Sequence, residues 1–308
     1  MRVLVTGAGG FVGHHLIADL GHAGHEVVAC SLHAFEAEAA SAIEAFDLRD
    51  AEATGAVIGR HEPDAVIHLA AQASVPRSWE APAETYEINV VGTSNLLEGV
   101  RNRPETRVLL VGSAQVYGSA GSNRPLTESD PLHPPSPYAV SKAAGELIGM
   151  LYHRELGVSV LAARPFNHTG PGQGEGYAVG HFCAQITDIS RGRNPLMRVG
   201  RLDSRRDFLD VRDVVAAYRL LIEGGDGGEV YNVASGEAVL IGDLLKILLD
   251  VAGLSGRVEV VEEAPPRAGD PQILVGDSSK IREAVGWRPE IPIEISLADT
   301  LAWYESRP

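Results

Sequence analysis

Short apolar runs alternate with amphipathic stretches along the first half of the chain. The run at residues 2–6 is followed by similar runs at residues 26–29, 64–69, 107–111 and 158–162. Nearly continuous apolar runs of this length, with helical patterns between them, are typical of buried parallel strands. The pattern therefore predicts an α/β fold built on a doubly wound parallel sheet.

Helical spacing of apolar residues covers residues 84–100 and 138–156. The second stretch has Ser136 in the N-cap position and Pro137 at the first helical position, which is a strong start signal. From Arg164 the texture changes to a Gly/Pro-rich loop over residues 164–176, and further helices are predicted at 211–223 and 241–251. These features predict a second, smaller C-terminal α/β lobe.

Composition narrows the class of protein. The chain has 308 residues, a hydrophobic content of 44% and a net charge of −15. No stretch approaches the roughly 20 apolar residues of a membrane span, and we expect no signal peptide, because the first predicted strand begins at Arg2. The negative charge argues against nucleic acid or an anionic membrane as a partner.

Cys30 and Cys183 are too few for a disulfide framework, so we expect a cytoplasmic protein. The histidines show no ligand spacing with Cys or carboxylates, so no metal site is expected.

Glycines at positions 7, 10 and 13 lie between the first predicted strand and an apolar helical pattern. Such a turn lets the backbone approach a pyrophosphate at a helix N-terminus. The spacing is one residue longer between the first two glycines than the usual dinucleotide fingerprint, and a plain turn is the alternative. The context favours a Rossmann-type dinucleotide-binding domain over residues 1–163, with a return segment near 206–235. Residues 164–308 would then form mainly the substrate lobe.

Tyr138 and Lys142 are four residues apart on the second predicted helix, so the phenol and the ammonium lie on one helix face. A nearby ammonium favours phenolate, and we expect it to lower the pKa of the phenol. The chain uses lysine at only three positions, which makes this one conspicuous. An accidental surface pair is the alternative.

A series of motifs in a fixed order extends from Arg2 to about Leu301. The motifs are Thr6-Gly7-x-x-Gly10-x-x-Gly13, Asp47-Leu48, His68-Leu69-Ala70-Ala71, Asn89-Val90-x-Gly92-Thr93, Ser113, Tyr117-Gly118, Tyr138-x-x-x-Lys142, Arg164-Pro165-Phe166-Asn167, Arg206-Asp207-Phe208, Arg267 and Gly286-Trp287-x-Pro289. Together they resemble the extended short-chain dehydrogenase/reductases that act on nucleotide-linked sugars. Within that family, residues 164–173 look most like the members that reduce GDP-linked 4-keto-6-deoxy sugars.

The resemblance implies a role for each matching residue. Ser113, Tyr138 and Lys142 would form the catalytic unit. The implied cofactor-binding residues are Gly7, Gly9, Gly10, Phe11, Val12, Gly13, Ser31, Asp47, Leu48, Leu69, Ala70, Ala71, Tyr138, Lys142 and Pro165. The implied substrate-binding residues are Ser113, Asn167, His168, Arg206 and Arg267. Asn89 fits a structural role and a direct contact equally well.

Cofactor choice depends on the end of the second predicted strand. An acid there would bind the ribose 2′-hydroxyl of NAD, and an arginine would bind the 2′-phosphate of NADP. The chain has Ser31 and His33 at this place and neither of those residue types. We therefore expect NADPH to be favoured slightly, with NADH also accepted.

Three functions are compatible with the sequence. The first is reduction of a GDP-4-keto-6-deoxy sugar. The second is epimerisation or 4,6-dehydration of a nucleotide sugar, and dehydration is disfavoured because Ala114-Gln115 cannot supply the acid and base that it needs. The third is non-catalytic dinucleotide sensing, which would have no need of Ser113, Tyr138 and Lys142. A homodimer is expected from the resemblance alone.

Overall fold

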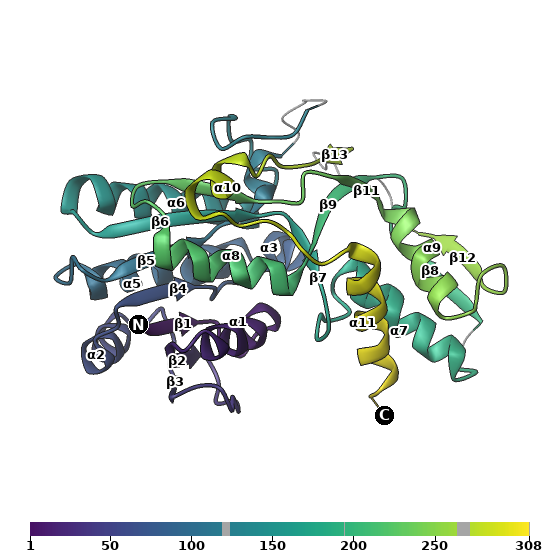
Figure 1. Ribbon diagram of the computed structural model, residues 1–308, viewed down its shortest axis with the longest axis horizontal. Helices are drawn as coiled ribbons and strands as arrows, with labels where there is room; N and C mark the ends of the chain where they lie inside the picture. Colours follow the sequence, from purple (N-terminus) through teal and green to yellow (C-terminus); the bar gives the residue numbers. More distant parts are fainter. Residues whose placement is uncertain (119–123, 194, 264–271, 308) are drawn as a thin grey trace.

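The computed structural model describes residues 1–118, 124–193, 195–263 and 272–307, which form a large lobe and a small lobe (Figure 1). The large lobe is built on one seven-stranded sheet in which every neighbouring pair is parallel. In spatial order its strands are β10 (Val230–Val233), β6 (Ser159–Pro165), β5 (Arg107–Val111), β4 (Ala65–His68), β1 (Arg2–Thr6), β2 (Glu26–Ser31) and β3 (Ala42–Ala45). The order confirms the predicted Rossmann-type doubly wound sheet.

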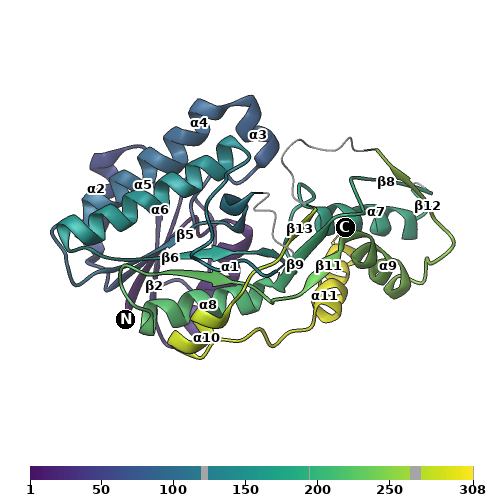
Figure 2. The same ribbon diagram turned by 90° about the horizontal axis from the view of Figure 1, so that it is seen from above.

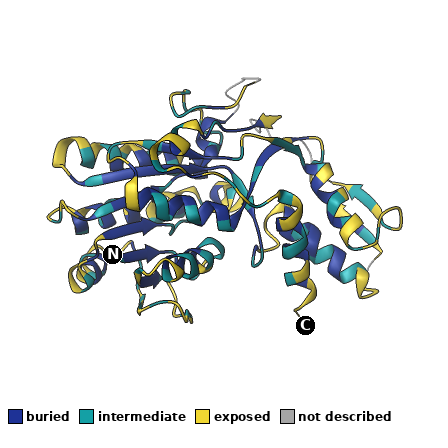
Figure 3. Ribbon diagram, in the orientation of Figure 1, coloured by how far each residue is buried: buried dark blue, intermediate teal, exposed yellow. Residues whose placement is uncertain are grey.

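Helices cover both faces of this sheet (Figure 2). One face carries α2 (Ala51–His61), α5 (Gly92–Val100) and α6 (Pro137–Leu156), and the other carries α1 (Phe11–His22), α8 (Val211–Gly224) and α10 (Ser279–Val285). Each face has its own apolar core, for example Leu16 and Leu109 on one side and Leu96 and Leu110 on the other. The buried residues follow the strands and the inner helix faces (Figure 3).

Helix α6 begins as the sequence predicts. The Ser136 hydroxyl accepts a hydrogen bond from the Ala139 amide, and Pro137 occupies the first turn, where a missing N–H costs nothing. Gly157 ends the helix in the left-handed conformation. The local signals thus fix the start of the helix that carries Tyr138.

Residues 84–100 are helical, as predicted, and the helical segment contains one π-helical turn that the pattern did not predict. The chain forms α4 (Pro82–Tyr86), a π-helical turn η1 (Glu87–Val91) and α5 without a break in direction, after a short helix α3 (Val75–Glu80). The wider turn places Asn89 in the protein interior, where its side chain is buried. Such π-turns frequently mark functional sites.

The small lobe has its own sheets and core. Its strands are β7 (Asn167–Thr169), β8 (Leu196–Val199), β9 (Arg205–Asp210), β11 (Ala238–Leu240), β12 (Glu259–Glu262) and β13 (Ile273–Leu274), and its helices are α7 (Ala178–Ser190), α9 (Ile241–Val251) and α11 (Ile293–Glu305). Strand β9 is central and pairs with β7, β11 and β13, while β8 pairs with β12. The predicted substrate lobe, residues 164–308, contains three elements that pack on the large lobe: α8, β10 and α10. Strand β9, at the start of the predicted return segment, belongs to the small lobe.

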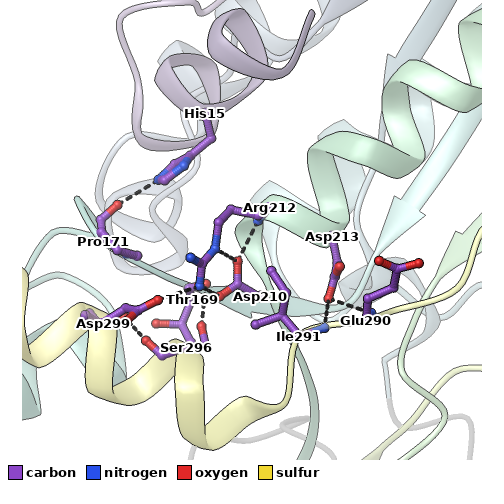
Figure 4. A network of polar contacts seen from close by, with 11 residues as sticks. His15, Thr169, Pro171, Asp210, Arg212, Asp213, Glu290, Ile291, Ser296 and Asp299 are labelled. Carbon is purple, nitrogen blue, oxygen red and sulfur yellow. Dashed lines mark hydrogen bonds and ion pairs between the residues drawn. The ribbon is translucent and has the colours of Figure 1, made fainter. Parts of the chain in front are cut away.

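A polar network joins the lobes where β9 runs into α8 (Figure 4). The fully buried Asp210 caps α8 by accepting from the Arg212 amide, and the Arg212 guanidinium bonds both Asp210 and Asp299 of α11. In the same first turn of α8, Asp213 accepts from the amides of Glu290 and Ile291. Arg212 is therefore used to hold the two lobes together.

Candidate active site

The glycine turn after β1 is shaped by close backbone approach. Gly7 has φ +71°, and a Cβ there would lie 2.7 Å from the Ala70 amide nitrogen. A Cβ on Gly13 would lie 2.4 Å from the Ala8 carbonyl oxygen. Gly10 caps α1 without a side-chain acceptor, and the first turn contains no acidic residue. The helix N-terminus therefore presents N–H groups and a partial positive charge, as pyrophosphate binding requires.

Ser31 lies beside the same turn, at the end of β2. A Cβ on Gly9 would meet the Ser31 hydroxyl at 2.9 Å and the Phe35 ring at 3.4 Å. Asp47 lies two residues after the end of β3, and its carboxylate accepts hydrogen bonds from Arg49 Nε and Nη2. The hydrogen bond from Arg49 holds the pKa of Asp47 below its usual value. Leu48, next to Asp47, packs against Gly92 of α5.

Ser113 and Tyr138 come from two neighbouring elements and meet. Ser113 follows β5 as the N-cap of a short 3₁₀ helix, η2 (Ala114–Tyr117), and Tyr138 lies in the first turn of α6. A hydrogen bond joins the Ser113 side chain to the Tyr138 phenol, and Tyr138 is only 8% exposed. Lys142 lies one turn further along α6, where its ammonium donates to the Val111 carbonyl oxygen at 2.7 Å.

The expected effect of Lys142 on Tyr138 is not what the structure shows. Burial raises the pKa of Tyr138 to about 12, and the Ser113 hydrogen bond opposes this only in part. Burial also lowers the pKa of Lys142 to about 8. The prediction that Lys142 lowers the pKa of Tyr138 is wrong here, because Lys142 is not one of the groups that shift this pKa and burial, the largest cause, raises it. Tyr138 therefore holds its proton at neutral pH.

The loop after β6 brings predicted cofactor and substrate residues together. Pro165 ends β6, and Asn167 and His168 follow in β7. The His168 ring stacks on Phe11, with centroids 6.3 Å apart and planes 11° apart, and its Nδ1 lies 3.0 Å from the Phe166 carbonyl oxygen. Burial lowers the pKa of His168, so the ring is neutral. The start of α1, directly after the glycine turn, is thus in contact with β7.

Arg206 lies on β9 in the small lobe and is largely buried, with Nη1 donating to the Arg205 carbonyl oxygen at 2.8 Å. Arg267, the other predicted phosphate ligand, lies outside the described residues. Asp207, between Arg206 and Phe208, serves the fold, because its carboxylate accepts from the amides of Ser235, Gly236 and Gly276.

A family model described as GDP-mannose 4,6 dehydratase matches residues 4–300. The chain belongs to this family. The resemblance to the extended short-chain dehydrogenase/reductases is thereby confirmed.

Two relatives match over almost their whole length. The chain is 38% identical to a GDP-6-deoxy-D-mannose reductase of Pseudomonas aeruginosa, covering 99% of this chain and 98% of the relative. It is 32% identical to a UDP-glucose 4-epimerase of Mycolicibacterium smegmatis, covering 100% and 99%. Among solved structures, RMD from Pseudomonas aeruginosa complexed with NADPH matches with a TM-score of 0.87 at 38% identity, covering 100% of this chain and 99% of that one.

Two of the family motifs serve the fold in this member. Arg164 is buried and bonds Glu146 through Nε and Nη2, while its Nη1 donates to the Tyr117 phenol oxygen at 2.7 Å. Tyr117 donates in turn to Asn232 of β10. This buried network ties α6, β6 and β10 to the 3₁₀ helix that Ser113 caps. Its partners are far apart in sequence, so spacing alone gave no sign of it.

Tyr177, at the N-cap of α7, influences Tyr138 and was not singled out in the sequence analysis. Its electrostatic influence raises the pKa of Tyr138, which indicates that this end of α7 lies near the Tyr138 phenol. No local pattern in the sequence distinguishes this tyrosine. Among the described residues, no group of three or more His, Cys, Asp or Glu side chains could hold a metal ion, and no helix is long and apolar enough to cross a membrane.

Proposed function

We propose that the protein reduces the 4-keto group of GDP-4-keto-6-deoxy-D-mannose to give GDP-D-rhamnose, with NADPH or NADH as the hydride source. The observation that carries this proposal is the buried Tyr138 phenol, which is hydrogen bonded to Ser113 and whose pKa is raised by burial, in a chain 38% identical over its full length to a GDP-6-deoxy-D-mannose reductase. Reduction of a ketone needs a proton donor at the carbonyl oxygen, and a phenol that keeps its proton at neutral pH fits that role.

The chain's own residues then divide the work. When bound, the dihydronicotinamide supplies a hydride to the ketone carbon. Tyr138 gives its proton to the oxygen as negative charge develops there, and Ser113 stabilises that oxygen by a hydrogen bond. Lys142, held by the Val111 carbonyl, keeps a positive charge on the same helix face below about pH 8.

The other functions have less support. A dehydratase needs an acid and a base after the serine, and Ala114 and Gln115 of η2 supply neither. A 4-epimerase can use the same three residues, and the 32% identity to an epimerase keeps it as the second candidate. A non-catalytic dinucleotide sensor would have no need of the contact between Ser113 and Tyr138.

The cofactor is proposed from the surroundings of the glycine turn. Neither an acid nor an arginine stands at the end of β2, where Ser31 packs against Gly9. A 2′-phosphate would meet no carboxylate there, which supports NADPH. NADH would bind with similar affinity, because no arginine is present there to bind the 2′-phosphate of NADPH. Comparison of the kcat/KM values for the two cofactors tests this: strong discrimination against NADPH would contradict it.

We also propose that Arg206, with Arg267, binds the substrate diphosphate. Its planar fork suits phosphate geometry, and its backbone on β9 is paired on both sides, with β11 and with β13. Arg206→Ala should weaken GDP binding by about 1.5–3 kcal/mol, the scale of hydrogen bonds to a charged group. Arg205→Ala, which changes the exposed neighbouring arginine, is the matched control. Calorimetric titration with GDP decides, and equal affinities in the two variants would place the diphosphate elsewhere.

A homodimer is proposed from an apolar surface on two adjacent helices. Val140, Leu147 and Leu151 of α6 are exposed, and Leu147 is 63% exposed. Tyr86 of α4 and Val91 of η1 extend this surface, since both elements pack against α6. An apolar surface of this kind on adjacent helices suits a second copy of the chain. Leu147→Asp should give a monomer by light scattering, whereas a wild-type monomer would rule the dimer out.

We infer a cytoplasmic location, because both cysteines are buried and unpaired. The negative net charge supports the absence of nucleic-acid partners.

Product analysis tests the proposed function. The protein should convert GDP-4-keto-6-deoxy-D-mannose with NADPH to one product, whose NMR couplings identify the configuration at carbon 4. The UDP- and dTDP-linked analogues are the comparison that tests the guanine preference. Turnover of a UDP-hexose without added cofactor would favour the epimerase.

A further inference from the structure

A buried histidine that the proposed chemistry does not use lies at the end of β4. The His68 side chain is between two hydroxyl groups, with Nδ1 2.7 Å from Thr6 Oγ1 and Nε2 3.0 Å from Thr93 Oγ1. The residue is only 4% exposed, and both threonines are buried. Both ring nitrogens are therefore hydrogen bonded inside the core, between β1 and α5.

Each threonine hydroxyl and the neutral imidazole ring has one proton to donate, and this fixes the direction of each hydrogen bond. The Thr93 hydroxyl donates its single proton to the Asn89 carbonyl oxygen at 2.7 Å, so it must accept from His68 Nε2–H. A neutral imidazole then has only an acceptor at Nδ1, and the Thr6 hydroxyl must donate to it. Thr6 Oγ1 can still accept the Ala70 amide at 3.3 Å. One directed chain thus runs from Ala70 through His68 to Asn89.

Asn89 continues this chain to the helix that carries Tyr138. Its side-chain oxygen accepts from the Gln72 amide at 2.7 Å, and its Nδ2 donates to Ser141 Oγ at 2.8 Å. Ser141 Oγ donates to the Tyr138 carbonyl oxygen at 2.7 Å. The π-helical turn η1 is what carries Asn89 to this position.

The surroundings keep His68 neutral. Burial, with a smaller contribution from the positive charge of Lys142, lowers the pKa of His68 to about 3. A proton on Nδ1 would remove the acceptor that Thr6 needs and would add a second buried cation beside Lys142. The hydrogen-bond pattern and the charges therefore agree on one tautomer.

We propose that His68 is a positioning residue, which fixes the loop at residues 69–71 relative to the helix carrying Tyr138 and Lys142. The loop supports the glycine turn, because a Cβ on Gly7 would meet the Ala70 amide at 2.7 Å. Movement of Ala70 therefore moves the backbone that faces the cofactor. The inference rests on the proposed function for the role of Tyr138, and it extends that function to a residue that contacts neither cofactor nor substrate.

Thr93→Val tests the chain with little change in volume. Thr300→Val is the matched control, because Thr300 is also buried in a helix and donates to the carbonyl four residues earlier, at 2.6 Å. Both variants lose the same local bond, and only Thr93→Val also removes the acceptor for His68. We expect Thr93→Val to lower kcat by about 10- to 100-fold with little change in KM, since small misplacement of reacting groups has effects of this size. Thr300→Val should stay within about twofold of the wild type at a similar melting temperature.

Two further measurements do not depend on the substrate. Nitrogen NMR of labelled histidine, with the His68 signals assigned by their loss in His68→Asn, should show the Nε2–H tautomer unchanged from pH 6 to pH 9. Hydrogen exchange should become faster at residues 69–72 and 138–142 in Thr93→Val and not in Thr300→Val. An Nδ1–H tautomer, or equal exchange and equal kcat in the two variants, would overturn the proposal. If the wild type reduces no keto sugar, the proposed function fails, and the exchange comparison still decides the role of His68.

Discussion

Tyr138 is the residue on which the proposed chemistry depends most. Burial holds its phenol in the protonated form, and Ser113 orients it by a hydrogen bond. The proton is therefore available for a developing alkoxide, the need of a ketone reductase. In the sequence, Tyr138 and Lys142 were recognisable as a pair. The state of the phenol was not, because it is set by burial beneath residues far away in the chain.

Tyr138→Phe should remove the proton donor and leave nucleotide binding nearly intact, because the phenol acts mainly in the transition state. We expect kcat to fall by about 10²–10⁴-fold. Tyr152→Phe, near the other end of the same helix, where the phenol donates to Glu98, is the control and should keep normal turnover. Stopped-flow and steady-state rates with saturating cofactor measure the effect. Retention of more than about a tenth of the wild-type turnover would remove Tyr138 from the mechanism.

Lys142 should reduce stability at neutral pH. Its pKa is about 8 in the folded protein and 10.5 ordinarily, so between these values the unfolded chain binds more protons. The stability of the wild type relative to Lys142→Met should therefore rise with pH from about 8 to 10.5. The expected rise is on the order of 1–3 kcal/mol, since one unit of pKa shift corresponds to about 1.4 kcal/mol. Urea unfolding of both proteins at pH 7 and pH 10.5 measures it. A pH-independent difference would mean that the ammonium is well solvated.

At the scale of elements, local signals predicted the structure well wherever the chain itself supplies the cause. The glycine turn, the start of α6 at Ser136 and the strand at residues 107–111 all depend on neighbouring residues. The π-turn around Asn89 does not, because helical periodicity across residues 84–100 gives no sign of one wider turn. Arg164 was noted only as part of a motif, since its partner Glu146 lies on a different element.

At the junction between β1 and α1, the backbone leaves no space for a side chain at Gly13. Gly13→Ala would bring a Cβ to 2.4 Å from the Ala8 carbonyl oxygen, and both belong to backbone that cannot move without disturbing the turn. We expect a loss of about 1–3 kcal/mol of stability and at least about a tenfold weaker cofactor affinity. Thermal unfolding and fluorescence titration with NADPH measure the two effects.

Gly59→Ala in α2 is the matched control for this substitution, because nothing lies within 4 Å of a Cβ at that site. It should stabilise the protein by up to about 1 kcal/mol, as alanine does in helix interiors. Unchanged NADPH affinity in Gly13→Ala would show that the cofactor does not lie on this turn.

At the scale of the whole molecule, the two lobes meet at the residues proposed to react. The stack of His168 on Phe11 and the influence of Tyr177 on Tyr138 both cross from the small lobe to the large one. The sequence predicted a second lobe and its substrate role. These contacts could not be predicted, because they depend on how the lobes pack.

The proposed reductase function depends on net hydride transfer from an exchangeable cofactor to a keto sugar. The most direct measurement follows NADPH deuterated at the transferred position during incubation with GDP-4-keto-6-deoxy-D-mannose. We predict that one cofactor is oxidised for each sugar consumed, by the loss of dihydronicotinamide absorbance, and that the deuterium appears at carbon 4 of the product. A constant absorbance, with a nucleotide sugar interconverted and free of deuterium, would contradict the reductase and leave Ser113, Tyr138 and Lys142 to an epimerase.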